Sequence, residues 1–176
     1  YGGGLHTKHR HIRYHDYFVA RCAPNERVLE VGCGNGALSH DIAQRSGCHV
    51  VGVDIEARKI AHARRQFPHQ RLELRVADAT RDDLHGRYDV IVLSNVLEHL
   101  VDRSGVLRRL TDTTGAERIL IRVPMFDRDW RVPLKKELGV EWRLDLTHET
   151  EYTVETFNQE MEDAGLRIVH QEMRWG

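Results

Sequence analysis

The sequence predicts an α/β fold, in which a doubly wound and mostly parallel β-sheet is flanked by helices. Two observations lead to this prediction. Short apolar runs suited to buried strands alternate with segments of helical periodicity over most of the chain. The first such run, 28–31, breaks directly into Gly32, Gly34 and Gly36, after which an amphipathic segment begins. Strand, glycine turn and helix in that order are the opening of a nucleotide-binding βαβ unit.

Length and composition indicate one globular domain. The 176 residues are 40% hydrophobic and 30% charged, and the net charge of -1 gives no overall attraction to nucleic acid or membrane. No apolar stretch is as long as a membrane span, and no signal peptide is visible. Three cysteines without metal-ligand spacing favour a reducing, cytoplasmic location and predict no metal site.

The chain opens with a segment, 5–22, that has the periodicity of a basic amphipathic helix. Its apolar face would consist of Ile12, Tyr14, Phe18 and Val19. Such a helix either packs beside the sheet with its charges in water, or acts as a lid whose cations meet an anionic substrate. A metal site is the less favoured alternative for the four histidines of this segment, which are His6, His9, His11 and His15.

The remaining elements follow from apolar periodicity and from breakers. Helices are expected up to residue 45 and over 56–67, 104–112 and 154–164, with Gly47, Pro68 and Gly165 at their ends. The segment 125–150 has no clear periodicity. Its Trp130 and Trp142 either pack or shape a pocket. Strands are expected at 28–31, 50–53, 72–76, 88–93, 119–123 and 166–173.

Acidic residues occur at the carboxyl ends of the first three strands. Glu30 directly precedes the glycine turn, where it would repel a pyrophosphate and attract a sulfonium amino acid with its free ammonium group. Asp54 ends the second strand, 24 residues later, in the position of a carboxylate that binds both ribose hydroxyls. Asp78 follows the third strand and would accept the amino group of adenine, with the Ala79 amide reaching a ring nitrogen.

The pattern E-x-G-x-G-x-G at 30–36 resembles the first motif of the class I S-adenosylmethionine (SAM) methyltransferases, and the likeness extends over about 24–171. It implies a Rossmann-like fold, SAM as the cofactor and S-adenosylhomocysteine (SAH) as the product. The seventh, antiparallel strand of that family would be missing, since the chain stops at Gly176. The expected cofactor-binding residues are Glu30, Gly32, Cys33, Gly34, Gly36, Asp54, Ile55, Asp78, Ala79, Asn95 and Val96.

The segment S-N-V-L-E-H-L, 94–100, resembles the one that follows the fourth strand in many small-molecule methyltransferases. By that likeness Asn95 and Val96 border the cofactor, while Glu98 and His99 reach the acceptor. His99 is the first candidate for a general base and His148 the second, although a histidine in a helical turn is often structural. The expected mechanism needs no metal.

The domain prediction is one methyltransferase domain, 1–176. It comprises a basic helix or lid (1–23), a cofactor-binding core (24–124), an acceptor-side insertion (125–152) and a C-terminal helix and strand (153–176). The expected enzyme methylates an oxygen or nitrogen of a small metabolite, with a sugar or an anionic glycan precursor of bacterial type as one candidate. Alternatives are an RNA or other nucleic-acid methyltransferase, a non-catalytic SAM-fold subunit and a nicotinamide-dependent oxidoreductase.

Overall fold

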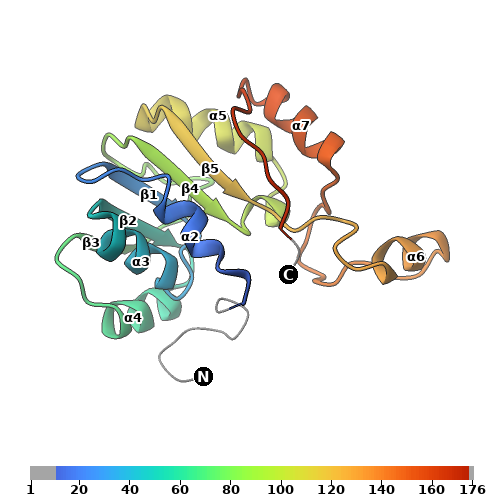
Figure 1. Ribbon diagram of the computed structural model, residues 1–176, viewed down its shortest axis with the longest axis horizontal. Coiled ribbons are helices and arrows are strands. Elements are labelled where there is room, and N and C mark those ends of the chain that lie inside the picture. Colours follow the sequence, from blue (N-terminus) through green and yellow to red (C-terminus); the bar gives the residue numbers. More distant parts are fainter. Residues whose placement is uncertain (1–10, 175–176) are drawn as a thin grey trace.

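The computed structural model describes residues 11–174, and within them one sheet of parallel strands forms the centre of the molecule (Figure 1). The strand order β3-β2-β1-β4-β5 reverses direction between β1 and β4, and a ligand site is expected at the carboxyl ends of those two strands. The strands are β1 (Arg27–Val31), β2 (His49–Asp54), β3 (Leu72–Val76), β4 (Val90–Ser94) and β5 (Arg118–Arg122).

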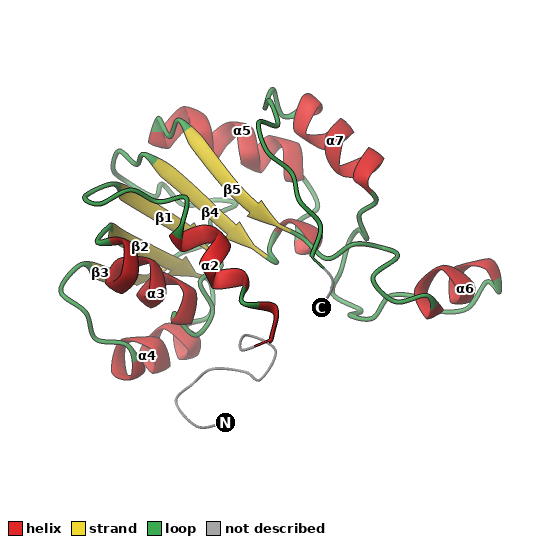
Figure 2. Cartoon of the chain, in the orientation of Figure 1, coloured by secondary structure: helices red, strands yellow, loops and turns green. Residues whose placement is uncertain are grey.

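Helices cover both faces of the sheet (Figure 2). On one face lie α2 (Tyr14–Val19), α3 (Ala37–Ser46) and α4 (Ala57–Gln66), and on the other lie α5 (Arg103–Thr114) and α7 (Val154–Asp163). Successive side chains of a strand point to opposite faces of the sheet, so each strand contributes to the core on both faces. Val28 packs with Phe18 and Ile42, whereas Leu29 packs with Leu107 and Ile91. The doubly wound fold that the sequence predicts is therefore confirmed.

The predicted strand at 166–173 is wrong, because the chain after α7 runs without regular structure. Val169 is 81% exposed, so the apolar residues of this stretch do not form a buried face. Its polar side chains instead contact helices: His170 stacks on Tyr17 with centroids 6.3 Å apart, and Gln171 binds Asn158 of α7. The segment thus contacts α2 and α7, and the described part of the sheet has five strands.

The segment 125–150 contains a helix that periodicity does not predict, α6 (Arg131–Glu137). Val132 is its buried residue, and a helix this short with one buried side chain has no recognisable apolar stripe. Trp130 is 72% exposed, whereas Trp142 packs edge to face on Phe126 at 5.6 Å. Trp142 is thus a packing residue.

The helix predicted at 5–22 is shorter in the part that the structure describes. Arg13 has a left-handed conformation (φ 51°), which separates α2 from the helical residues His11 and Ile12 before it. Phe18 is fully buried, and Tyr14 and Val19 pack around it, as the predicted apolar face requires. Residues 5–10, including His6 and His9, lie outside the described part. No helix within residues 11–174 is long and apolar enough to cross a membrane.

Candidate active site

The three glycines of the turn after β1 all have positive φ, but their surroundings differ. A Cβ on Gly32 would lie 2.5 Å from Cγ2 of Val96, and one on Gly36 would lie 2.9 Å from the Cβ of Ala63 in α4. A Cβ on Gly34 would meet nothing within 4 Å. Gly32 and Gly36 therefore permit close packing of the protein itself, while Gly34 borders open space where a ligand can approach the backbone.

Asp54, at the end of β2, binds the glycine turn and the next loop at once. Its Oδ2 accepts a hydrogen bond from the Gly34 N–H at 2.9 Å, and its Oδ1 accepts one from the Glu56 N–H at 2.8 Å. The carboxylate is buried, and each oxygen keeps a second lone pair. Asp54 can therefore hold the turn in shape and still accept hydroxyl groups of a ligand.

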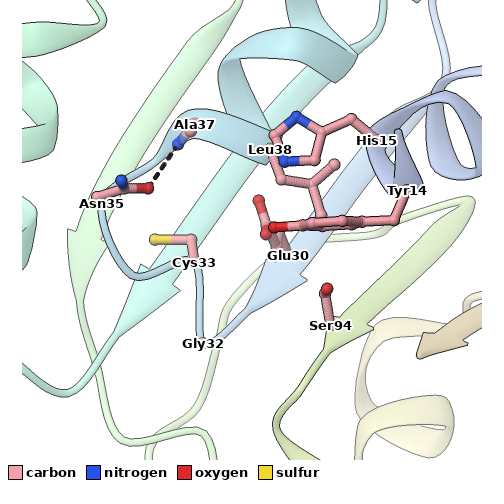
Figure 3. Close-up of a pocket in the computed structure, with 9 residues that line it drawn as sticks. All are labelled: Tyr14, His15, Glu30, Gly32, Cys33, Asn35, Ala37, Leu38 and Ser94. Atoms are coloured by element: carbon pink, nitrogen blue, oxygen red, sulfur yellow. Dashed lines mark hydrogen bonds between the residues drawn. The ribbon is translucent and has the colours of Figure 1, made fainter. Parts of the chain in front are cut away.

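Glu30 lies beneath this turn, 2% exposed, and accepts a hydrogen bond from the hydroxyl of Ser39 in α3. The pKa of its carboxyl group is raised to about 8, mainly by burial and in smaller part by the nearby charge of Asp54. Tyr14 of α2 lines the same cavity, with its ring beside Glu30 (Figure 3). Burial also raises the pKa of Tyr14, to about 12. The site thus offers a buried acid that a cationic ligand group would ionise.

The cavity in Figure 3 has Glu30, Gly32 and Cys33 in its wall, with Ser94 of β4 opposite. Cys33 is buried, and burial raises the pKa of its thiol, so it contributes shape rather than charge. Tyr17 of α2 does not belong to this lining, and its ring centroid lies 3.8 Å from the guanidinium carbon of Arg21.

Two of the predicted adenine-side residues lie at the end of β3, beyond this cavity. Asp78 accepts hydrogen bonds from the N–H and hydroxyl of Thr80, at 2.9 and 2.6 Å, which hold its pKa below the usual value. The carbonyl group of Ala79 accepts a hydrogen bond from Arg109. Ile55, directly after Asp54, is 65% exposed and offers an apolar surface beside the same edge.

The loop after β4 connects the cofactor side to the acceptor side. Asn95 has a left-handed conformation (φ 57°), and its Oδ1 accepts a hydrogen bond from Nη1 of Arg122 at 2.7 Å. The Arg122 guanidinium also lies 4.3 Å from the ring centroid of Tyr14. Burial lowers the pKa of Arg122, and the nearby charge of Glu98 partly offsets this, while no carboxylate of residues 11–174 forms an ion pair with it. A partly buried cation without an ion-pair partner can bind an anionic ligand.

Beyond Asn95, the 3₁₀ helix η2 (Leu97–His99) brings Glu98 and His99 next to His148. Each of the three side chains offers one ligand atom, and these atoms all lie within 4.8 Å of one another. The two imidazole rings meet edge to face with centroids 4.8 Å apart. The two candidate bases, 49 positions apart in the chain, therefore share one site.

Neighbouring groups fix both rings. His148 Nδ1 lies 2.9 Å from Oε1 of Glu151, and that carboxylate is held by the guanidinium of Arg128. His99 Nδ1 lies 3.2 Å from the Thr147 carbonyl oxygen. In each ring the Nδ1 atom is thus engaged with the protein, and Nε2 is the atom left for chemistry.

Sequence reasoning missed three residues of this site, and each had a signal. Ser39 is a small polar residue on the buried face of the helix after the glycine turn. Arg122 is a cation at the end of an apolar strand. Glu151 follows His148 at a spacing of three, which suits a carboxylate that orients an imidazole.

The parallel sheet, the glycine turn and the acids at the strand ends define a class I SAM-dependent methyltransferase fold. Residues 5–171 match the family described as methyltransferase domain. The chain belongs to that family, and SAM, with SAH as product, is the cofactor of its class, as the sequence predicted.

Named relatives agree with this assignment. A ubiquinone biosynthesis O-methyltransferase of Aeromonas salmonicida (strain A449) is 35% identical over 126 residues, which are 69% of this chain and 52% of the relative. The chain thus spans about half the length of the curated relatives it matches. A second ubiquinone biosynthesis O-methyltransferase, from Hahella chejuensis (strain KCTC 2396), is 34% identical over 72% of this chain and 65% of its own length.

Solved structures share the fold. A TehB-like SAM-dependent methyltransferase of Corynebacterium glutamicum superposes with a TM-score of 0.61 at 19% identity, over 85% of this chain and 70% of its own. Coclaurine N-methyltransferase, solved with N-methylheliamine and SAH, gives a TM-score of 0.59 at 22% identity, over 67% of this chain and 37% of its own.

Proposed function

We propose that this chain transfers the methyl group of SAM to a hydroxyl oxygen of a small-molecule acceptor. One observation carries the proposal. The loop after β4 packs Val96 against Gly32 of the glycine turn and then, within the next three residues, places Glu98 and His99 beside His148. Groups suited to the donor and groups suited to the acceptor therefore adjoin each other along one short segment.

The donor would bind along the strand ends. Glu30 would take the ammonium group of the methionine part, Asp54 the two ribose hydroxyls and Asp78, with the Ala79 amide, the adenine. The buried Glu30 supports this arrangement, since an ammonium group would stabilise its ionised form. Open space at Gly34 supports a close approach of the ligand to the backbone. The exposed apolar side chain of Ile55 suits a contact with the base.

The chemistry is an in-line displacement. A lone pair of the acceptor oxygen forms a bond to the methyl carbon while the carbon–sulfur bond breaks, and its electron pair stays on sulfur. The sulfonium thereby becomes the neutral thioether of SAH. The hydroxyl proton passes to Nε2 of His99 or His148, whose Nδ1 atoms are engaged with the protein. A general base of this kind contributes roughly 10²–10⁴ in rate.

We propose further that the acceptor carries an anionic group, which Arg122 binds. Arg122 is held between Asn95 and the ring of Tyr14, and no carboxylate of the described chain forms an ion pair with it. An acceptor carboxylate or phosphate would supply that partner. This feature, rather than the basic N-terminal segment, supports an anionic acceptor, since Arg13 pairs with Asp16 at 2.9 Å.

The relatives named above favour oxygen over nitrogen as the methylated atom, because they are O-methyltransferases. Neither they nor the site supports the sugar or glycan acceptor that the sequence suggested. The nucleic-acid and non-catalytic alternatives are not favoured either. We place the reaction in the cytoplasm, in keeping with three buried cysteines that form no disulfide.

The experiment measures methyl transfer directly. The protein is incubated with SAM and a panel of hydroxyl compounds, namely phenols, catechols, their carboxylated forms and simple sugars, and methylated products are identified by mass spectrometry. We expect products from carboxylated phenols or catechols. In parallel, SAH should raise the melting temperature while NAD does not. SAH binding without transfer to any hydroxyl compound would contradict the proposal.

A further inference from the structure

The Glu98–His99–His148 cluster has the composition of a metal site as well as that of a base. Two imidazoles and one carboxylate present ligand atoms within 4.8 Å of one another, a span that one ion can bridge. Two histidines with one carboxylate are a common ligand set for divalent transition metals, and they leave coordination positions open. Sequence spacing does not indicate this site, because His148 lies 49 positions after His99 in the chain.

A second observation points to a ligand at this place. Glu98 is 1% exposed, and its Oε2 atom has no hydrogen-bond partner among residues 11–174. A buried carboxylate oxygen without a partner is unfavourable, because nothing replaces the water it has lost. A cation between the two imidazoles and this oxygen would remove that cost.

The surrounding contacts suit imidazoles that act as ligands. A metal-binding histidine usually gives its other ring nitrogen to a carboxylate or a carbonyl group, which fixes the tautomer and the orientation. Here Nδ1 of His148 lies 2.9 Å from Glu151, and Nδ1 of His99 lies 3.2 Å from the Thr147 carbonyl. Arg128 in turn fixes Glu151. With the Nδ1 atoms engaged in this way, Nε2 is in each ring the nitrogen that can bind an ion.

We infer that Glu98, His99 and His148 bind a divalent transition-metal ion, of the Mn²⁺ or Zn²⁺ kind, through one carboxylate oxygen and two Nε2 atoms. The inference deepens the proposed function and rests on it for the role of the ion. An acceptor oxygen bound at an open coordination position would lose its proton to solvent water more readily, because the cation stabilises the oxyanion. The imidazoles would then hold the ion instead of taking the proton, and an acceptor with two adjacent oxygens would bind best.

The test begins with metal binding in the absence of substrate. Mn²⁺ is titrated into the chelator-treated protein and followed by calorimetry and electron paramagnetic resonance, with Zn²⁺ as a second probe. We expect one site per chain and ¹⁴N couplings from two imidazoles in the Mn²⁺ spectrum. His148→Ala and Glu98→Gln should abolish that site. Glu151→Gln should weaken it about 10- to 100-fold, as loss of an orienting carboxylate does at other metal sites.

Glu149→Gln is the matched control, because this exposed carboxylate is next to His148 and outside the cluster. It should bind Mn²⁺ as the unaltered protein does. Circular dichroism and SAH binding show whether each variant is folded. No saturable binding of either ion, or binding that survives both His148→Ala and Glu98→Gln, would overturn the inference.

The same samples separate this inference from the proposed function. Methyl transfer that a chelator abolishes and Mn²⁺ or Zn²⁺ restores supports both. Transfer that persists after chelation overturns the role of the ion in the reaction and leaves the histidines as bases. Metal binding without transfer to any hydroxyl compound overturns the proposed function and leaves the metal site intact.

Discussion

The backbone N–H of Gly34 donates a hydrogen bond to Oδ2 of Asp54 over 2.9 Å, which joins the glycine turn after β1 to the end of β2. The acid expected to bind the ribose is therefore also a structural support for the loop that approaches the ligand. A change at either residue affects both the shape of the turn and the affinity for the cofactor.

Replacement of Asp54 by alanine should weaken SAH binding about 10- to 100-fold, since each lost hydrogen bond to a charged group is worth roughly 1.5–3 kcal/mol. The variant should also unfold more easily, because Gly34 and Glu56 lose their acceptor. Asp89→Asn is the control, as Asp89 accepts the Arg27 N–H at 2.7 Å at the far end of β1. Calorimetry should find normal SAH affinity in the control; unchanged affinity in Asp54→Ala would refute the ribose assignment.

Alanine at the three turn glycines should separate stability from binding. Gly32→Ala and Gly36→Ala should both lower the melting temperature, because the added Cβ atoms would lie 2.5 Å from Val96 and 2.9 Å from Ala63. Gly34→Ala should cost only the left-handed strain, roughly 1–2 kcal/mol, and yet should lose most SAH affinity. Gly165→Ala matches it in positive φ and open surroundings, away from the site. Equal SAH affinity in Gly34→Ala and Gly165→Ala would show that the ligand does not lie at the turn.

Glu30 should make both stability and cofactor binding depend on pH. Its pKa rises from 4.5 to about 8 on folding, so the unfolded chain loses this proton first and the free energy of unfolding falls as pH rises between those values. SAH binding should tighten over the same range, because the ammonium group requires the carboxylate. Glu30→Gln should abolish both dependences. Chemical denaturation and calorimetry at several pH values measure them, and a pH-independent wild type would contradict the assignment.

Arg122→Met should raise the KM for carboxylated acceptors much more than that for neutral analogues, because only the former lose a charged partner. The expected change is about tenfold or more, from a charge-assisted hydrogen bond of roughly 1.5–3 kcal/mol. Arg122→Lys should restore part of the effect. Steady-state kinetics with a matched pair of acceptors decides the matter, and equal losses for both acceptors would assign Arg122 a purely structural role through Asn95.

His99→Ala and His148→Ala should lower turnover about 10²-fold or more while SAH affinity stays within a few-fold, because both residues lie on the acceptor side. His62→Ala, on the exposed face of α4, serves as the control. Single-turnover rates and SAH titration distinguish the two effects. Full activity in both variants would remove the pair from the mechanism.

The sequence predicted the fold well because its core signals are local. Apolar runs located all five strands, and Gly47 ends α3 in a left-handed conformation as expected for a C-terminal cap. The prediction of a strand at 166–173 was wrong, because this apolar segment contacts α2 and α7 without regular structure. The sequence also could not pair His99 with His148, or Arg122 with Tyr14, since those contacts depend on tertiary packing across distant parts of the chain.

The carbonyl oxygen of Glu98 accepts hydrogen bonds from the N–H groups of Glu149 and Thr150, at 2.7 and 3.3 Å. The Phe126 N–H donates a hydrogen bond to the Tyr152 carbonyl at 2.6 Å. The two ends of the segment 126–152 are thus bound to each other, while α6 extends outward (Figure 1). Residues 130–140 can therefore be replaced by the corresponding segment of a homologous protein while the backbone contacts that position Glu98 stay in place.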